Sequence, residues 1–310
     1  MASSARKTTA LEAPAATQVP ARRGRPPQTA AALAPAAPAM RRGRHHREGA
    51  EDDDGEGGDR QFVVALARGL GVLSAFHARD GALGNRELAE RTGVPPATIS
   101  RITHTLTKLG YLTFDRWRET YDLGGSTLAL GHLALARLNI RRVAVPLMQQ
   151  LADGANANVG LGVRDRLTML YAETCEGSGP VGLRLHAGSR IPMATTAMGR
   201  AYLAALGEMA RAELLHELQP QFGTEWPAVL RGIEKASRDI QRHGFCLSAG
   251  EWQKDINGVA VSLVEPATGN VYALNLGGPA YMLKEADLLK EHGPRLLATR
   301  NEILARLRAL

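Results

Sequence analysis

The chain has 310 residues and a formal net charge of +7, with 44% hydrophobic and 22% charged residues. This length can hold two domains, and the excess of positive charge is weak support for a polyanionic partner. Two cysteines do not make a disulfide framework and fit a reducing cytoplasm, and we find no apolar run of about 18 residues that would span a membrane. Proline interrupts the alanine-rich N-terminal pieces, so we expect no signal peptide.

The first 59 residues are rich in Ala, Pro, Gly and Arg, a composition that predicts a disordered tail. Its basic residues come first, and residues 48–59 (EGAEDDDGEGGD) then carry only acidic charges. The stretch ARRGRPPQ resembles an AT-hook, in which Arg23 and Arg25 would enter the narrow minor groove of A·T-rich DNA. A solvated basic tail explains the same residues, and for so short a match we favour it.

Ordered structure is expected from about Gln61. The segment FVVALARGLGVLSAF (62–76) predicts a helix that buries one apolar face, formed by Val63, Leu66, Leu70, Leu73 and Phe76. A second helix runs through ELAERTG, with Asn85 as its cap, Leu88 and Ala89 facing inward, and Gly93 at its end.

The segment GVPPATISRITHTLTKLGYL (93–112) predicts a third helix, which begins near Pro95 and Pro96. One side is an apolar stripe of Ile99, Ile102, Leu106 and Leu109. The opposite side carries small, hydroxyl and basic residues and no acid: Ala97, Ser100, Arg101, His104 and Lys108. A helix that only covers a core usually shows a mixture of acids and bases. Together with the preceding helix and the tight turn at Gly93, the pattern predicts a helix-turn-helix.

Two short strands should follow, at 111–114 and 119–123, with a tip at 115–118, which completes a winged helix-turn-helix. The second helix of such a unit lies in the major groove of DNA, where a guanidinium can pair with guanine. We therefore expect Arg101 to read a base, Ser100 and His104 to contact bases or phosphates, and Thr98 and Lys108 to contact phosphate. Arg116 and Arg118 would grip the backbone or the minor groove from the wing. The alternative is an ordinary helical hairpin.

The rest of the chain predicts a helical linker region and a second domain. Residues 126–152 are helical with a new start at Pro146, and their apolar face suggests a second subunit. After residue 153 the pattern predicts an α+β (mixed α/β) domain around a mostly antiparallel sheet. Its expected elements are a hairpin across Asp165-Arg166, a strand at 181–188, helices at 195–206 and 228–244, a hairpin at 257–278 and a terminal helix. The predicted boundaries are therefore 1–59, 60–125, 126–152 and 153–310.

Several segments together resemble the IclR family of bacterial transcriptional regulators: RGLGVLSAF, ELAERTGVPPATISRITHTLTKLGYL, YDLGGSTLALG, GSRIPMATTAMGRAYLAAL and RHGFCLSAGEWQKDINGVAVSLVEPATGNVYALNLGGP. The resemblance covers about 61–310. It implies a GAF-like second domain that binds a small effector, an operator in double-stranded DNA, and a homodimer or homotetramer in the cytoplasm. The residues themselves suggest no cofactor and no metal site.

The same resemblance places the effector beside a loop of small residues and the last strands. The implied contacts are Leu183, Met193, Ala194, Thr195, Thr196, Ala197, Met198, Cys246, Ser248, Glu251, Asn257 and Asn275. A helix that begins at Thr195 would offer backbone N–H groups to a carboxylate, although Thr195 could equally be a simple cap. After Phe245 the chain reads SAGEWQKD where many members have adjacent acids, so Glu251 and Asp255 are either structural or set a different effector preference.

Two other functions fit part of the sequence. An enzyme with a DNA-binding appendage is disfavoured, because the second domain has no nucleophile elbow or phosphate loop, and the spacing of His186, His243, Cys246 and Glu251 matches no standard zinc site. An architectural DNA-binding protein with a vestigial sensor would use mainly the basic tail. We favour a non-enzymatic repressor or activator whose effector is a metabolite carboxylate.

Overall fold

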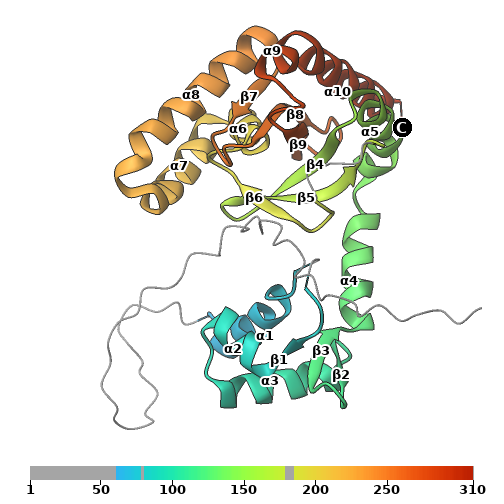
Figure 1. Ribbon diagram of the computed structural model, residues 1–310, viewed down its shortest axis with the longest axis vertical. Helices are drawn as coiled ribbons and strands as arrows, with labels where there is room; N and C mark the ends of the chain where they lie inside the picture. Colours follow the sequence, from blue (N-terminus) through green and yellow to red (C-terminus); the bar gives the residue numbers. More distant parts are fainter. Residues whose placement is uncertain (1–60, 78–79, 179–184, 310) are drawn as a thin grey trace, which may run out of the picture. The chain divides into compact units, whose positions relative to one another are not determined.

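The computed structural model describes residues 61–77, 80–178 and 185–309 (Figure 1). Arg23 and Arg25 of the tail lie outside these residues, as do Leu183 and half of the strand expected at 181–188; the described half, residues 185–188, is a loop and turn rather than a strand.

The N-terminal part is a winged helix-turn-helix, as the sequence predicts. Its helices are α1 (Val64–Ser74), α2 (Asn85–Thr92) and α3 (Pro96–Lys108), and its strands are β1 (Leu83–Gly84), β2 (Leu112–Asp115) and β3 (Thr120–Leu123). The strands pair antiparallel in the order β1-β3-β2 (Figure 1). A small core joins them through Val72, Leu83, Leu88, Ile99 and Leu112, each at most 3% exposed.

The turn between α2 and α3 forms where the sequence places it. Gly93 ends α2 with φ +70°, a left-handed conformation that suits glycine, and α3 begins at Pro96. Asn85 is not the cap of α2, because Gly84 precedes the helix and its N–H donates to the Glu87 carboxylate. The Asn85 side chain instead joins the two helices, donating to Ser100 Oγ at 3.3 Å and accepting from Thr103 Oγ1 at 3.1 Å.

The end of α2 is also tied to the segment that follows α1. Arg91 donates to the Ala75 carbonyl at 2.9 Å and binds the Asp80 carboxylate through both terminal nitrogens. The Arg91 guanidinium lowers the pKa of Asp80 from 3.8 to about 2. This pair therefore stabilises the packing of α1 on α2 at neutral pH.

Two expectations about buried faces are wrong. Val63, Leu66 and Leu70 are 55–60% exposed, whereas Leu73 and Phe76 pack against the core as expected, beside the buried Val72 and Ala75. Apolar residues surround most of α1, so periodicity does not decide which face is buried. Leu109 is also 60% exposed, because it follows α3 at the point where the backbone leaves the helix.

The linker region forms two helices, α4 (Gly125–Ala136) and α5 (Asn139–Ala155). Pro146 does not start a helix but lies inside α5. The buried residues of α5 lie on both sides of this proline, which shows that packing overrides the local preference: Ile140, Ala144, Leu147, Met148, Leu151 and Ala152. By contrast, α4 has no buried residue.

The C-terminal part is built on a six-stranded antiparallel sheet with the order β6-β5-β4-β9-β8-β7. Both predicted hairpins form. The strands are β4 (Asn158–Asp165), β5 (Thr168–Cys175), β6 (Arg190–Pro192), β7 (Cys246–Ala249), β8 (Ile256–Val264) and β9 (Val271–Pro279).

Helices cover the two faces of this sheet differently (Figure 1). On one face pack α5 and α10 (Gly293–Arg308), the latter preceded by a short α9 (Glu285–Asp287) and a π-helical turn at Leu288–His292. On the other face pack α6 (Ala197–Ala204), α7 (Glu208–Phe222) and α8 (Trp226–His243). The sequence pattern missed α7 and the three-residue β6. The observed mixture of helices and antiparallel strands confirms the expected fold class.

Candidate nucleic-acid interface and effector site

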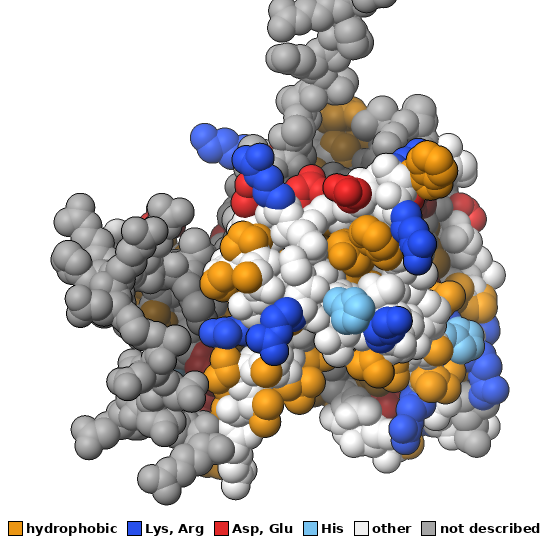
Figure 2. Space-filling view, turned by 90° about the horizontal axis from the view of Figure 1, so that it is seen from below, with side chains coloured by type: hydrophobic (Ala, Val, Ile, Leu, Met, Phe, Trp, Pro, Cys, Tyr) orange, Lys and Arg blue, Asp and Glu red, His pale blue; other side chains and the backbone are white. Residues whose placement is uncertain are grey.

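The exposed face of α3 carries the predicted DNA contacts side by side. Ser100, Arg101, His104 and Lys108 are exposed, and Thr98 is half-buried at the start of the helix. On the inner side of α3, Ile99 is buried and Thr103 Oγ1 donates to Asn85 Oδ1 at 3.1 Å. These contacts hold α3 against α2. Seen from below in Figure 2, Lys, Arg and His side chains lie across the middle of this face, and the acidic side chains lie mainly towards its upper edge.

The wing ends in a four-residue turn, Arg116–Glu119, that Asp115 holds in shape. Asp115 Oδ1 accepts from the backbone N–H groups of Trp117 at 2.8 Å and Arg118 at 3.3 Å. Glu119 closes the turn with φ +53°, in the left-handed region. The turn leaves Arg116 and Arg118 exposed, as the sequence predicts.

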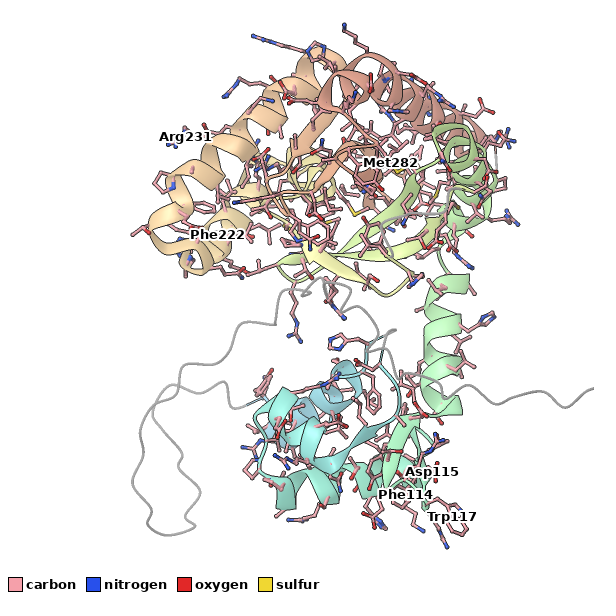
Figure 3. All side chains as sticks on the ribbon, in the orientation of Figure 1. Phe114, Asp115, Trp117, Phe222, Arg231 and Met282 are labelled. Atoms are coloured by element: carbon pink, nitrogen blue, oxygen red, sulfur yellow. The ribbon has the colours of Figure 1, made fainter. Side chains whose placement is uncertain are left out.

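Sequence reasoning missed Trp117. Its side chain is 98% exposed at the wing tip, and in Figure 3 it points away from the strands. Phe114 and Tyr121 stack on the strands behind it, with ring centroids 4.7 Å apart. An indole in water is unusual, and its position between two arginines was a usable signal for a nucleic-acid contact.

The loop before α6 is buried rather than open. Met193, Ala194 and Met198 are fully buried, and Ala197 is 4% exposed. The cap of α6 is Thr196, not Thr195, because Thr196 Oγ1 accepts from the Gly199 N–H at 3.2 Å. The helix therefore begins at Ala197, two residues later than the sequence suggests.

Two side chains of β7 form hydrogen bonds with this loop and hold it against the sheet. Ser248 Oγ donates to the Thr195 carbonyl at 2.8 Å, and Cys246 Sγ lies 3.5 Å from the Ala197 carbonyl. Burial raises the pKa of the Cys246 thiol to about 12, so it stays protonated and unreactive. The structure thus brings Thr195, Ala197, Cys246 and Ser248 together.

Glu251 joins the same group through Arg200, a residue that sequence reasoning missed. Arg200 is 2% exposed and donates through Nη1 and Nη2 to the two oxygens of Glu251, at 2.8 and 2.6 Å. Its Nε donates to the Ala194 carbonyl at 2.9 Å. The Glu251 carboxylate is therefore held by a bidentate pair, which favours a structural role.

Asn275 of β9 faces the same side of the sheet, above two glycines of β4. A side chain at Gly160 would collide with Tyr171 and Asn275, and one at Gly162 would collide with Met198. Asn275 Nδ2 donates to the Tyr171 hydroxyl at 3.1 Å, and a cavity of about 10 Å³ lies beside them. The space beside these residues is therefore small, with room for about one water molecule.

Asn257 is not part of this group. It shares the face of β8 that carries Val259 and Val261, packed on α5 and α10, and its Nδ2 donates to the Leu283 carbonyl at 2.9 Å. Among the described residues, no group of three His, Cys, Asp or Glu side chains could hold a metal ion. No helix in the described ranges is long and apolar enough to cross a membrane.

Comparison with known families gives two matches along the chain. The IclR helix-turn-helix domain matches residues 65–116, and the C-terminal domain of the bacterial transcriptional regulator IclR matches residues 132–304. The regulator TsaQ1/TsaQ2 of Comamonas testosteroni is 33% identical over 250 residues, which cover 80% of this chain and 90% of that protein.

Solved structures agree with these matches. An IclR family transcriptional regulator from Brucella abortus is 44% identical with a TM-score of 0.67, over 80% of this chain and 94% of that one. An IclR homologue from Microbacterium hydrocarbonoxydans, complexed with 4-hydroxybenzoate, is 22% identical with a TM-score of 0.65, over 79% of this chain and all of that one, and supports the fold.

Proposed function

This chain belongs to the IclR family of bacterial transcriptional regulators, and from that premise we propose that α3 and the wing read its operator while a small carboxylate bound beside α6 changes operator affinity. The observation that carries the DNA-binding part is the acid-free exposed face of α3. Arg101, His104 and Lys108 stand on it without an acidic side chain among them, so phosphate and base edges are the partners that fit.

The two cations of α3 have different roles in this proposal. Arg101, in the middle of the face, pairs with a guanine, and Lys108, in the last turn, contacts phosphate. We expect Arg101→Ala to cost about 1–3 kcal/mol and to relax the preference at one base pair. Lys108→Ala should weaken binding to all sequences equally and reduce the slope of log K against log salt by about one unit.

The test uses an operator selected from random DNA by repeated binding to the full chain. Fluorescence anisotropy with this operator and single-base variants, across a salt series, measures both effects. Arg238→Ala, which removes an exposed arginine of α8, is the matched control and should change neither. If Arg101→Ala keeps both affinity and base preference, α3 is not the reading helix.

The proposal of an effector site rests on the buried polar side chains beside α6 and on the family to which the chain belongs. Thr195, Thr196, Ser248 and Asn275 place hydroxyl and amide groups on one face of the sheet. A homologue of the same fold is complexed with 4-hydroxybenzoate, a carboxylate. The apolar surface around those groups comes from Met193, Ala194, Ala197, Met198 and Cys246. Glu251 supports the site through Arg200, and Leu183, which the family resemblance adds, lies outside the described residues.

A ligand that binds the folded protein raises its Tm in proportion to the logarithm of ligand concentration over Kd. We therefore screen aromatic and aliphatic carboxylates, 4-hydroxybenzoate included, by thermal shift, and then measure operator release by anisotropy. The neutral amide of each acid is the matched control and should bind less well. If no acid raises the Tm or changes operator affinity, the carboxylate proposal fails.

The protein is further proposed to act as a homodimer or a tetramer built from dimers. Exposed apolar residues occur on α1 and α4, and α4 has neither a charged nor a buried residue. A second copy is the occupant that fits, because a dimer can contact two half-sites about one DNA turn apart. We expect Leu66→Glu to shift the mass measured by light scattering towards the monomer. Met209→Glu, which places the same charge at an exposed apolar position of α7, should leave the mass unchanged. An unchanged mass for Leu66→Glu would contradict this assignment.

A further inference from the structure

We propose that Tyr171 and Asn275 form a subsite that recognises a neutral hydroxyl group of the ligand. This inference rests on the effector function proposed above and specifies its chemistry. Both side chains are buried, 3% and 9% exposed, and they lie beside the cavity on the α6 side of the sheet. The remaining described walls of this cavity include Asn158, Gly160 and Thr174, none of them charged.

An irregularity in β5 brings the two sides of the subsite together. Leu161 pairs with Glu173 and Gly162 pairs with Tyr171, so Ala172 has no partner in β4. This extra residue is a β-bulge, and it turns Tyr171 to the same face as Thr174. Asn275 reaches this face from the other side of β4, where it pairs with Gly160. Gly160 thus lies between them, and its lack of a side chain keeps the space open.

Tyr171 and Asn275 do not use all of their hydrogen-bonding groups, and the unused groups indicate which partner would fit. Asn275 Nδ2 donates to the tyrosine hydroxyl, and Asn275 Oδ1 is buried with no hydrogen-bond partner. The tyrosine hydroxyl accepts that bond, so its own hydrogen is free to donate. One donor and one acceptor side by side match a group that both donates and accepts, which is what a hydroxyl does.

Turning the Asn275 amide over does not change this result. The tyrosine hydroxyl would then donate to the amide oxygen, and its lone pair and the amide N–H would face the cavity. In both orientations the pair offers one donor and one acceptor. A buried acceptor without a partner is unfavourable, so a ligand that satisfies it gains affinity, by about tenfold or more.

The charge and size of the cavity favour a neutral substituent over a carboxylate at this point. Burial raises the pKa of Tyr171 strongly, so its hydroxyl stays protonated, and the described walls offer no cation. An ion placed here would lose its hydration without a counter-charge. Space for about one oxygen atom exists already, and the flexible Met198 side chain over Gly162 can move to admit the rest of the ligand.

The test compares ligands that differ by one hydroxyl, using the full chain and isothermal titration. The pairs are 3-hydroxybenzoate and benzoate, 4-hydroxyphenylacetate and phenylacetate, lactate and propionate, and phenol and toluene. In at least one pair the hydroxylated member should bind about tenfold tighter or more, because a site built for a hydroxyl leaves its own groups unpaired with the other member. The phenol pair tests the subsite even if no carboxylate binds.

Two variants assign the preference to the proposed residues. Tyr171→Phe and Asn275→Leu should each remove the preference for the hydroxylated member of the pair. Tyr272→Phe is the matched control, since Tyr272 is equally buried on the opposite face of the sheet, and it should keep the preference. If Asn275→Leu fails to fold, Tyr171→Phe alone decides.

The subsite is overturned if no pair shows a preference, or if the preference survives Tyr171→Phe. These outcomes differ from failure of the function proposed above. An acid that releases operator DNA regardless of its hydroxyl supports the regulator and overturns the subsite. A hydroxyl preference without any change in operator affinity supports the subsite and contradicts effector control.

Discussion

Replacing Glu251 by Gln tests whether the buried Arg200 depends on its counter-charge. Gln keeps the shape of Glu and removes only the charge. Arg200 is 2% exposed and donates to both Glu251 oxygens, so the variant leaves a buried cation with one weak acceptor in place of a carboxylate. We expect the free energy of unfolding in urea to fall and the preference among bound ligands to stay unchanged.

The magnitude follows from burial on the two sides of the pair. Breaking a fully buried pair by removing one partner costs about 3–5 kcal/mol. The Glu251 side chain is 43% exposed, so water screens the pair from that side and reduces the loss. A loss of about 1–3 kcal/mol is therefore expected.

Glu302→Gln on α10 is the matched control. Glu302 pairs with Arg306 at 2.8 Å, and both side chains are about half exposed, so its loss should be at most about 0.5 kcal/mol. If Glu251→Gln costs no more than Glu302→Gln, Arg200 does not need its counter-charge. If it instead changes which ligands bind, Glu251 contacts the effector and its role is not structural.

Four further outcomes are expected. Trp117→Ala should weaken operator binding in anisotropy about tenfold, or about 1.4 kcal/mol, without lowering the Tm, since its 98% exposed ring supports no core; equal affinity would exclude a DNA contact. Gly199→Ala should lower the free energy of unfolding by about 3 kcal/mol or more, because its Cβ would lie 2.1 Å from a backbone carbonyl of the preceding loop. Asp80→Asn should lower the free energy of unfolding by about 2 kcal/mol at pH 7. Because the pKa of Asp80 is lowered to about 2 beside Arg91, the difference between the two proteins should disappear as the pH falls from about 4 to 2. A difference that does not change with pH would exclude the ion pair. Deleting residues 1–59 should keep operator specificity and flatten the salt dependence of binding, and an unchanged salt slope would exclude a DNA contact by the basic tail.

The winged helix-turn-helix could be predicted because its signals are local. Gly93 and Pro96 mark the turn and the next helix within a few residues, and one stripe fixes the orientation of α3. The face of α1 could not be predicted, since apolar residues surround it and only tertiary packing selects Val72. For α7, two buried leucines and an internal proline give too weak a pattern.

The sequence indicated the loop before α6 as part of the candidate effector site, but the contacts that support this loop could not be predicted. Arg200 and Glu251 are 51 positions apart, and nothing in either local pattern announces the pair. Asn257 is different, because the alternation of β8 already places it with Val259 on the face away from Asn275. The family resemblance indicated the region, and the alternation of side chains along β8 would have excluded Asn257 from it.

The unpaired Ala172 gives β5 one residue more than the strand it pairs with, so the sheet can lose a residue here without changing its register. Glu173 pairs with Leu161 and Tyr171 with Gly162, so deleting Ala172 would leave a regular ladder in which both pairs and their faces are kept. Deleting Tyr171 instead would let Ala172 take its place opposite Gly162, and the pocket wall would lose its hydroxyl while the sheet kept its pairing. Relatives that are one residue shorter in β5 are therefore the ones to compare for altered ligand choice.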